Sequence, residues 1–236
     1  MKRKLLNVTL LGVDCVNIER LIRSANICEK DFEFGAVKLL TSLPSTDSRV
    51  IQIEHIGSIK DYSLFCIQKM ADYVDTEFVL IIQHDGFILN PNAWSKDFLK
   101  YDYIGAPIWN EDFGKEGSWL DLWVVGNGGF CVRTKKLLSI LQELSKDGTI
   151  TETQPEDTVI CVTHKKLLES KGIRFAPLEL ARQFSFEASD GAGKKWNGEF
   201  GFHDLRYTDI SAWSGYDNWK LATASAGSRN GGTTGK

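Results

Sequence analysis

Several features are missing from this sequence, and each absence excludes a class of protein. No apolar run approaches the roughly 20 residues that cross a bilayer, and the longest run, residues 78–82, suits a buried strand, so we expect no integral membrane segment. The five cysteines form no C-x-x-C pair, which argues against a zinc site of that type and favours buried thiols in a reducing compartment. The 28 Lys and Arg are fewer than the 31 Asp and Glu, and this balance of −3 argues against a dedicated nucleic-acid binder.

The composition that remains is that of a soluble globular protein. Apolar residues make up 42% and charged residues 25% of the 236 residues, too apolar for a disordered chain. The N-terminus has a basic head but no apolar core or cleavage site of a signal peptide, so we expect a cytoplasmic location. No large apolar residue follows Leu221, so we expect one domain over residues 1–213 and a flexible tail over 214–236.

The first eighty or so residues alternate between strand and helix patterns. Apolar runs predict strands at residues 8–13, 34–40, 50–53 and 78–82. Helical spacing predicts a helix from Ile18 to Ala25 and a second around Leu64 to Val74, with Ser58 or Asp61 available as its cap. This alternation predicts an α/β fold with a mostly parallel sheet and helices on its faces.

The second half is less regular. Its patterns predict short strands and helices followed by a glycine-rich loop. The expected elements are strands at 103–106, 129–132 and 174–178, helices at 137–144 and from Pro155 to about Leu168, and a loop over 185–201.

A polar turn, Gln83-His84-Asp85-Gly86, follows the most apolar strand. Polar residues at the carboxyl end of a parallel strand lie where α/β folds bind ligands, and a carboxylate there can hold a divalent cation against a diphosphate. His-Asp-Gly is also good turn chemistry, so a purely structural turn is the alternative.

Two further motifs carry a functional and a structural interpretation. Gly126, Gly128 and Gly129 surround Asn127, and glycines there allow the backbone to approach a ligand closely or to form a hairpin turn. Glu156 and Asp157 open an expected helix, either as partners of its dipole or as a carboxylate base that takes a proton from an acceptor hydroxyl.

A late histidine and a group of aromatic residues complete the candidates. His203 lies between Gly-containing aromatic sequence and Asp204, which suits either a metal or phosphate contact or an ordinary structural histidine. Aromatic residues crowd residues 94–123 among polar ones, a mixture that suits sugar rings or a small core under a loop. We expect Trp109 and Trp119 to face an acceptor.

These motifs in this order resemble those of the GT-A nucleotide-sugar glycosyltransferases. More narrowly, the chain is similar to a family of short GT-A-like domains of bacteria and large algal viruses long catalogued as a domain of unknown function. The resemblance covers about residues 5–210, and its combination of motifs is fairly specific. The matching stretches are residues 82–88, 103–109, 126–130, 155–157 and 175–177.

The resemblance implies a three-layer α/β/α GT-A-like fold, a nucleotide-sugar donor, and Mn²⁺ or Mg²⁺. GT-A enzymes hold the metal with an Asp-x-Asp turn. In this chain Gln83 stands at the position of the first acid and Asp85 matches the last. His203 would complete the metal site. Inverting members use a carboxylate at a helix start as base, which maps to Asp157 with Glu156 as the substitute. The nucleotide-sugar contacts implied are Leu11, Gly12, Val13, Asp14, Lys60, Ser63, Gln83, His84, Asp85, Gly128 and Gly129.

The expected activity is glycosyl transfer from a UDP- or dTDP-sugar to a saccharide hydroxyl, with inversion, in polysaccharide biosynthesis. A sugar nucleotidyltransferase is one alternative, although the sequence Leu11 to Asp14 lacks the Gly-rich loop with Arg and Lys that such enzymes carry. The second alternative is a non-catalytic carbohydrate-binding domain on the same fold.

Overall fold

The computed structural model describes residues 1–109, 123–152, 155–187, 194–206 and 208–227. The strands are β1 (Arg3–Val13), β2 (Phe32–Thr41), β3 (Val50–Gln52), β4 (Phe78–Ile82), β5 (Tyr103–Gly105), β6 (Pro107–Trp109), β7 (Trp123–Val125), β8 (Cys131–Thr134), β9 (Ser185–Phe186), β10 (Lys194–Lys195), β11 (Gly201–Phe202) and β12 (Thr208–Asp209). The α-helices are α1 (Ile18–Asp31), α2 (Ile59–Gln68), α3 (Lys135–Lys146), α4 (Glu156–Thr158), α5 (Lys165–Ser170), α6 (Leu178–Phe184) and α7 (Tyr216–Gly227). Short 3-10 helices cover Met70–Tyr73, Pro91–Ala93 and Lys96–Lys100, and a π-helical segment covers Val159–Thr163.

The main sheet has six strands in the order β3-β2-β1-β4-β8-β5. The first four strands are parallel, whereas β8 runs antiparallel to both β4 and β5. All five residues of β4 are buried, as expected for a strand in the middle of a sheet that is covered on both faces. The predicted α/β fold with a mostly parallel central sheet is therefore confirmed.

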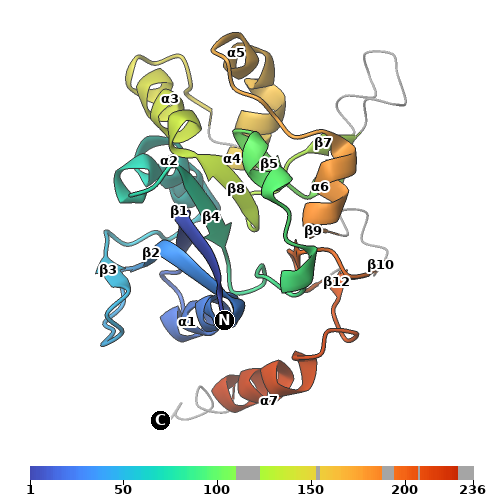
Figure 1. The fold of residues 1–236 in the computed structure, drawn as a ribbon. Helices are drawn as coiled ribbons and strands as arrows, with labels where there is room; N and C mark the ends of the chain where they lie inside the picture. The colour runs from blue at the N-terminus through green and yellow to red at the C-terminus, as the bar shows by residue number, and fades with distance from the viewer. Residues whose placement is uncertain (110–122, 153–154, 188–193, 207, 228–236) are drawn as a thin grey trace.

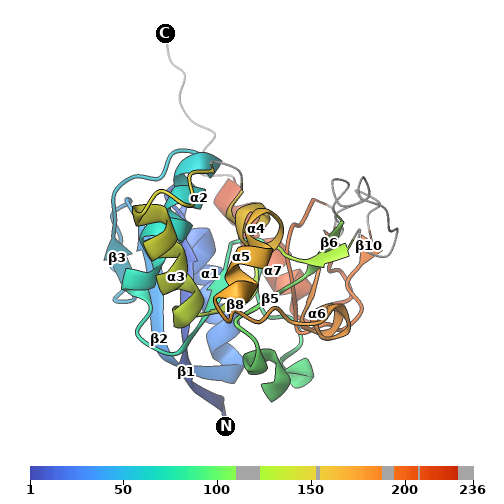
Figure 2. The same ribbon diagram turned by 90° about the horizontal axis from the view of Figure 1, so that it is seen from above.

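The order in which the chain visits the strands explains why helices cover both faces of the sheet. The connection from β1 through α1 leads to β2 on one side of β1, and the connection from β3 through α2 leads to β4 on the other. Right-handed crossovers in opposite directions place their helices on opposite faces. Figure 1 shows α2 and α3 on the other side of these strands from α1, and Figure 2 shows the same molecule from above.

Local side chains cap the first two helices, and of the two caps only Ser58, offered together with Asp61, was expected from the sequence. The Asn17 side chain accepts a hydrogen bond from Glu19 N–H at the start of α1, and Ser58 does the same for Asp61 at the start of α2. The buried face of α1 carries Leu21, Ala25 and Cys28 at helical spacing. All five cysteines are buried and free, as expected for small apolar side chains.

Segments before and after β8 in the chain form smaller strand pairs near a group of buried aromatic rings. The antiparallel pair β6–β7 and the parallel pair β9–β11 lie outside the main sheet. Phe130, Phe184 and Phe200 contact one another with ring centroids 5.1–5.9 Å apart. These rings join the strand pairs to the core.

Several predictions differ from the structure. The loop expected over residues 185–201 contains the short strands β9 and β10. Residues 174–178 form no strand: one bridge joins Phe175 to Tyr103, and α6 begins at Leu178, because Pro177 favours the first turn of a helix over a strand interior. The helix expected from Pro155 to Leu168 is interrupted by the π-helical segment. Part of the predicted flexible tail is the helix α7, which packs Tyr216 and Trp219 against the core, while residues 228–236 lie outside the described residues. No helix in the described ranges is long and apolar enough to span a bilayer.

Candidate functional site

A pocket of about 440 Å³ lies where β1 and β4 end, and we call it the nucleotide-side pocket. Strand order reverses between these two strands, and α/β sheets bind ligands at the carboxyl ends of strands at such a point. The volume falls within the roughly 300–1,000 Å³ of small-molecule sites. Four predicted residues line it, together with Arg20 and Tyr62: Val13, Asp14, Gln83 and His84.

Asp14 organises the start of α1 beside this pocket. Its carboxylate accepts hydrogen bonds from the backbone N–H groups of Val16 and Asn17, and Arg20 contacts it at 2.5 and 3.2 Å. Asp14 is buried, so the guanidinium partner compensates a charge that would otherwise be costly. The sequence patterns missed Arg20, because an arginine on the polar side of a helix carries no signal of its own.

The turn Gln83–Gly86 is both a turn and a cluster of polar groups. Backbone hydrogen bonds of 3.0 and 3.2 Å join Gln83 and Gly86 in both directions, which confirms the turn chemistry. Asp85 Oδ1 is buried and has no hydrogen-bond partner among the described residues. It lies 3.5 Å from His84 Nδ1 and 3.9 Å from His203 Nε2. Buried carboxylate oxygens rarely lack a hydrogen bond, so this oxygen, with only these two longer ion-pair contacts among the described residues, is a candidate ligand atom.

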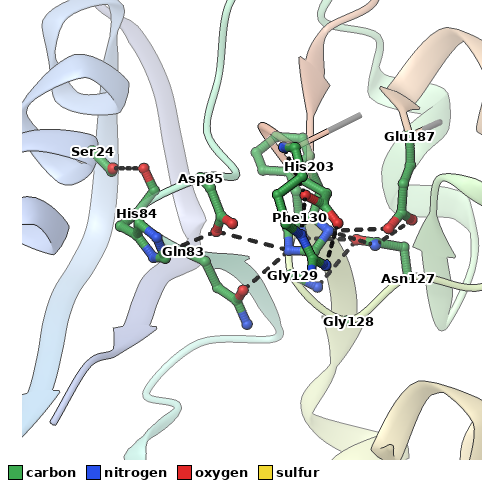
Figure 3. A network of polar contacts seen from close by, with 12 residues as sticks. Ser24, Gln83, His84, Asp85, Asn127, Gly128, Gly129, Phe130, Glu187 and His203 are labelled. Atoms are coloured by element: carbon green, nitrogen blue, oxygen red, sulfur yellow. Dashed lines mark hydrogen bonds and ion pairs between the residues drawn. The ribbon is translucent and has the colours of Figure 1, made fainter. Parts of the chain in front are cut away.

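His203 lies between Asp85 and Glu187, as Figure 3 shows. Its Nδ1 is 3.3 Å from Glu187 Oε1 and 2.9 Å from Asn127 Nδ2, and its Nε2 is 3.1 Å from Gln83 Oε1. Burial disfavours the protonated ring, but the hydrogen bond and charge of Glu187 outweigh it, so the pKa of His203 is raised above its usual value. Burial lowers the pKa of His84 instead.

The glycines of the Gly126–Phe130 loop make room for other side chains. A Cβ on Gly129 would lie 2.0 Å from His203 Nε2, and one on Gly128 would lie 2.0 Å from Glu156 Oε1. Asn127 has φ +63°, and its Oδ1 accepts hydrogen bonds from the N–H groups of Gly129 and Phe130. The loop is not a hairpin, because β7 pairs with β6 and β8 pairs with β4 and β5. The glycines therefore allow close approach of the His203 and Glu156 side chains, and a close approach to a ligand stays a prediction.

The two acids at the start of α4 have different surroundings. Glu156 is buried and forms an ion pair of 2.8 Å with Arg133, whose side chain is 0% exposed. Burial raises the pKa of the Glu156 carboxyl against the opposing charge of Arg133. This placement favours a structural role over the substitute base.

Asp157 is only partly buried. Its Oδ2 accepts a hydrogen bond from Gly128 N–H at 3.2 Å, and its Oδ1 accepts one from Thr158 N–H at 2.7 Å. His203 lies against Gly129, so Asp157 and the group around Asp85 flank neighbouring residues of one loop.

Several predicted nucleotide contacts lie away from the pocket wall. Leu11 and Gly12 are inside β1, where Leu11 is buried and a Cβ on Gly12 would meet Leu21 at 2.5 Å. Ser63 is buried and donates its hydrogen bond to Ile59 O. Lys60 is exposed on the first turn of α2 and does not line the pocket.

The two tryptophans expected at the acceptor stay predictions. Trp109 ends β6 opposite Trp123 in the strand pair, and its side chain lies outside what the structure describes. Trp119 lies outside the described residues altogether.

The chain has a GT-A-like α/β fold with a pocket at the ends of β1 and β4. The structure of galactosyltransferase LgtC with donor and acceptor sugar analogs is similar in fold: 12% identity, TM-score 0.51, covering 92% of this chain and 95% of that one. The family described as a protein of unknown function, DUF5672, matches residues 46–203, and the chain belongs to this family.

Two further structures match with lower TM-scores. The glycosyltransferase GlyE of Streptococcus pneumoniae TIGR4 is 14% identical with a TM-score of 0.48, and this chain spans 64% of its length while 97% of this chain is covered. The inositol-1-phosphate CTP transferase of T. maritima is 13% identical with a TM-score of 0.44, covering 91% of this chain and 94% of that one. A search of curated proteins gave no match.

Proposed function

We propose that the protein is a glycosyltransferase that moves a sugar from a UDP- or dTDP-sugar to a saccharide hydroxyl, with inversion. One observation carries the proposal: a pocket of nucleotide size at the ends of β1 and β4 adjoins the turn of Asp85, whose buried Oδ1 has no hydrogen-bond partner among the described residues. The fold shared with LgtC supports the same class of reaction without fixing it.

The nucleotide would occupy the nucleotide-side pocket. Arg20 and Tyr62 lie in its wall and supply a cation and an aromatic ring, while His84 and Gln83 lie at the end that continues to Asp85. The diphosphate would then lie against the turn, near His203. This direction places the sugar beside the Gly126–Phe130 loop, which contacts both His203 and Asp157.

Asp85 and His203 are the residues that would hold a divalent cation. No group of three or more His, Cys, Asp and Glu side chains in the described part of the chain is placed to hold a metal ion. Mg²⁺ nevertheless binds through one or two carboxylates together with substrate phosphates, and Asp85 Oδ1, which lacks a hydrogen bond among the described residues, fits that arrangement. The cation would supply Lewis-acid stabilisation of the leaving diphosphate.

In the proposed reaction, Asp157 acts as the general base. The acceptor hydroxyl oxygen bonds to the anomeric carbon as its proton passes to the Asp157 carboxylate. The bond between that carbon and the diphosphate oxygen breaks, and its electron pair leaves with the nucleoside diphosphate. The N–H groups of Gly128 and Thr158 hold the carboxylate in place.

A thermal-shift screen of nucleotide sugars with and without Mn²⁺ tests donor binding, because a ligand of the native state raises the melting temperature. UDP- or dTDP-sugars should raise it. Slow release of the nucleoside diphosphate on incubation with the donor supports a transferase. Binding of sugar without donor binding supports the non-catalytic alternative, and pyrophosphate release from a nucleoside triphosphate and a sugar phosphate supports the nucleotidyltransferase.

Two variants separate the roles of the acids. Asp157→Asn should reduce transfer by about 10²–10⁴-fold, the usual contribution of a general base, while donor affinity stays unchanged. Full activity in this variant would remove Asp157 as the base. Asp85→Ala should weaken donor binding in the presence of Mn²⁺, and unchanged affinity by calorimetry would contradict the cation site.

A further inference from the structure

A second, smaller pocket lies on the other side of His203, and we call it the Ser185 pocket. Its volume is about 260 Å³, and its lining includes Pro107, Trp123, Arg182, Ser185, Phe186 and Glu187. This is less than the roughly 300–1,000 Å³ of sites for drug-sized ligands, so its size suits a single ring rather than a chain of rings. No predicted site residue lines it.

One residue of the pocket wall, Ser185, carries a buried hydroxyl that lacks a hydrogen-bond partner among the described residues. Ser185 is 1% exposed, and its Oγ has no hydrogen-bond partner among the described residues. A serine hydroxyl supplies one donor and two acceptor positions, and such groups are almost always paired when buried. A ligand hydroxyl in the pocket would satisfy it.

The pocket is connected to the candidate reaction centre through Glu187. The parallel pair β9–β11 sets Ser185 opposite Gly201, and His203 N–H donates to Phe186 O at 3.0 Å. Glu187 therefore reaches His203 and Asn127 with its carboxylate while it also lines the pocket (Figure 3). A carboxylate has about four acceptor positions, so Glu187 retains capacity for a ligand hydroxyl.

The remaining walls are of the kind that binds sugar rings. Trp123 and Phe186 offer aromatic surface, which suits the apolar C–H face of a pyranose, while Ser185, Glu187 and Arg182 suit its hydroxyl rim. Arg182 also bonds to Glu179 at 2.5 Å, so it is held beside the pocket.

We propose that the Ser185 pocket binds one pyranose ring of the acceptor saccharide. The assignment to the acceptor rests on the proposed function, because the nucleotide-side pocket lies on the Asp85 side of His203 and the Ser185 pocket lies on the Glu187 side. A donor therefore approaches the reaction centre from one side and the acceptor ring from the other.

Saturation-transfer NMR tests the pocket with the full chain and the methyl glycosides of glucose, galactose and mannose as probes. At least one glycoside should give a signal. Ser185→Ala should weaken its binding about tenfold, the upper end for one lost hydrogen bond. Ser211→Ala, a change at an exposed serine outside the pocket, should leave it unchanged. No signal from any glycoside, or equal binding to Ser185→Ala, overturns the proposal.

Competition separates the acceptor from the sugar of the donor. A glycoside that stays bound when UDP-glucose or UDP-galactose is saturating occupies an acceptor site. A glycoside that these donors displace but UDP does not displace occupies the donor sugar site, and this result overturns the assignment to the acceptor. Calorimetry of UDP on the unmodified protein is a separate test: glycoside binding without UDP binding retains the pocket and contradicts the proposed transfer.

Discussion

The two sides of His203 are built in different ways. The nucleotide-side pocket is lined by residues 13–16, 20, 56–59, 62 and 83–84, which come from the regular alternation of strands and helices. The Ser185 pocket joins β6 and β7 to β9, and β9 is tied to the site by pairing with β11. The first side follows from the strand order of an α/β sheet, whereas the second depends on contacts between segments that share no repeating pattern.

The two sides of His203 also differ in whether their buried polar groups have partners within the chain. On the nucleotide side, Asp14 has Arg20 as its partner. Asp85 Oδ1, which lies next to His203, has no hydrogen-bond partner among the described residues. The Oγ of Ser185, on the Glu187 side of His203, also lacks one among these residues. Buried polar atoms without a hydrogen-bond partner among the described residues therefore lie on Asp85, Ser185 and also Arg133, whereas the Asp14 carboxylate in the nucleotide-side pocket has its partner within the chain.

The largest effect on stability is expected at the Arg133–Glu156 ion pair, which lies against the Gly126–Phe130 loop. Arg133→Met leaves Glu156 buried without its partner, so the free energy of unfolding should fall by about 3–5 kcal/mol in chemical denaturation. Arg174→Met removes a side chain that is 71% exposed and 4.0 Å from Asp102, and it should change stability by less than about 0.5 kcal/mol.

A double variant distinguishes a buried charge from lost packing. Arg133→Met combined with Glu156→Met should recover most of the loss, because apolar pairs replace buried ion pairs at little cost. Equal losses in the single and double variants would show that packing, rather than the unpaired charge, supports the loop.

A smaller effect is expected in the nucleotide-side pocket. Arg20→Met leaves the Asp14 carboxylate uncompensated in the wall of the pocket where the anionic nucleotide would bind, so UDP should bind about tenfold more weakly in calorimetry. Arg23→Met is the matched control on the same helix, because Arg23 donates to Ala222 O and does not line the pocket. Equal losses in both variants would mean that α1 as a whole, and not the Asp14–Arg20 pair, determines affinity.

The smallest effect is a difference in titration between two histidines. Burial lowers the pKa of His84, and Glu187 raises that of His203, so NMR titration should place the two rings on opposite sides of about 6.5. The protonated His203 ring should stabilise the fold fully below that pH, and this contribution should be lost as the pH rises through its raised pKa. Glu187→Gln should lower the pKa of His203, and an unchanged value would contradict the pairing.

Sequence patterns found part of the candidate site. Gln83, His84 and Asp85 were predicted from their position after an apolar strand, and β4 does end at Ile82. Arg133 and Glu187 were missed, since neither the strand pattern around β8 nor the glycine-rich sequence after β9 distinguishes a buried charge from a surface one. Ser63 was placed at the ligand from the resemblance alone, and its hydroxyl is used inside α2.

The sequence by itself determined the alternation of strands and helices, the caps of α1 and α2, and the polar turn at the end of β4, because these depend on residues near one another in the chain. Only the tertiary structure decided that His203 lies between Asp85 and Glu187, that Arg133 takes Glu156 as its partner, and that a second pocket forms at Ser185. Those contacts join residues 16 to 118 positions apart, and pairings over such separations depend on how the whole chain packs rather than on any local pattern.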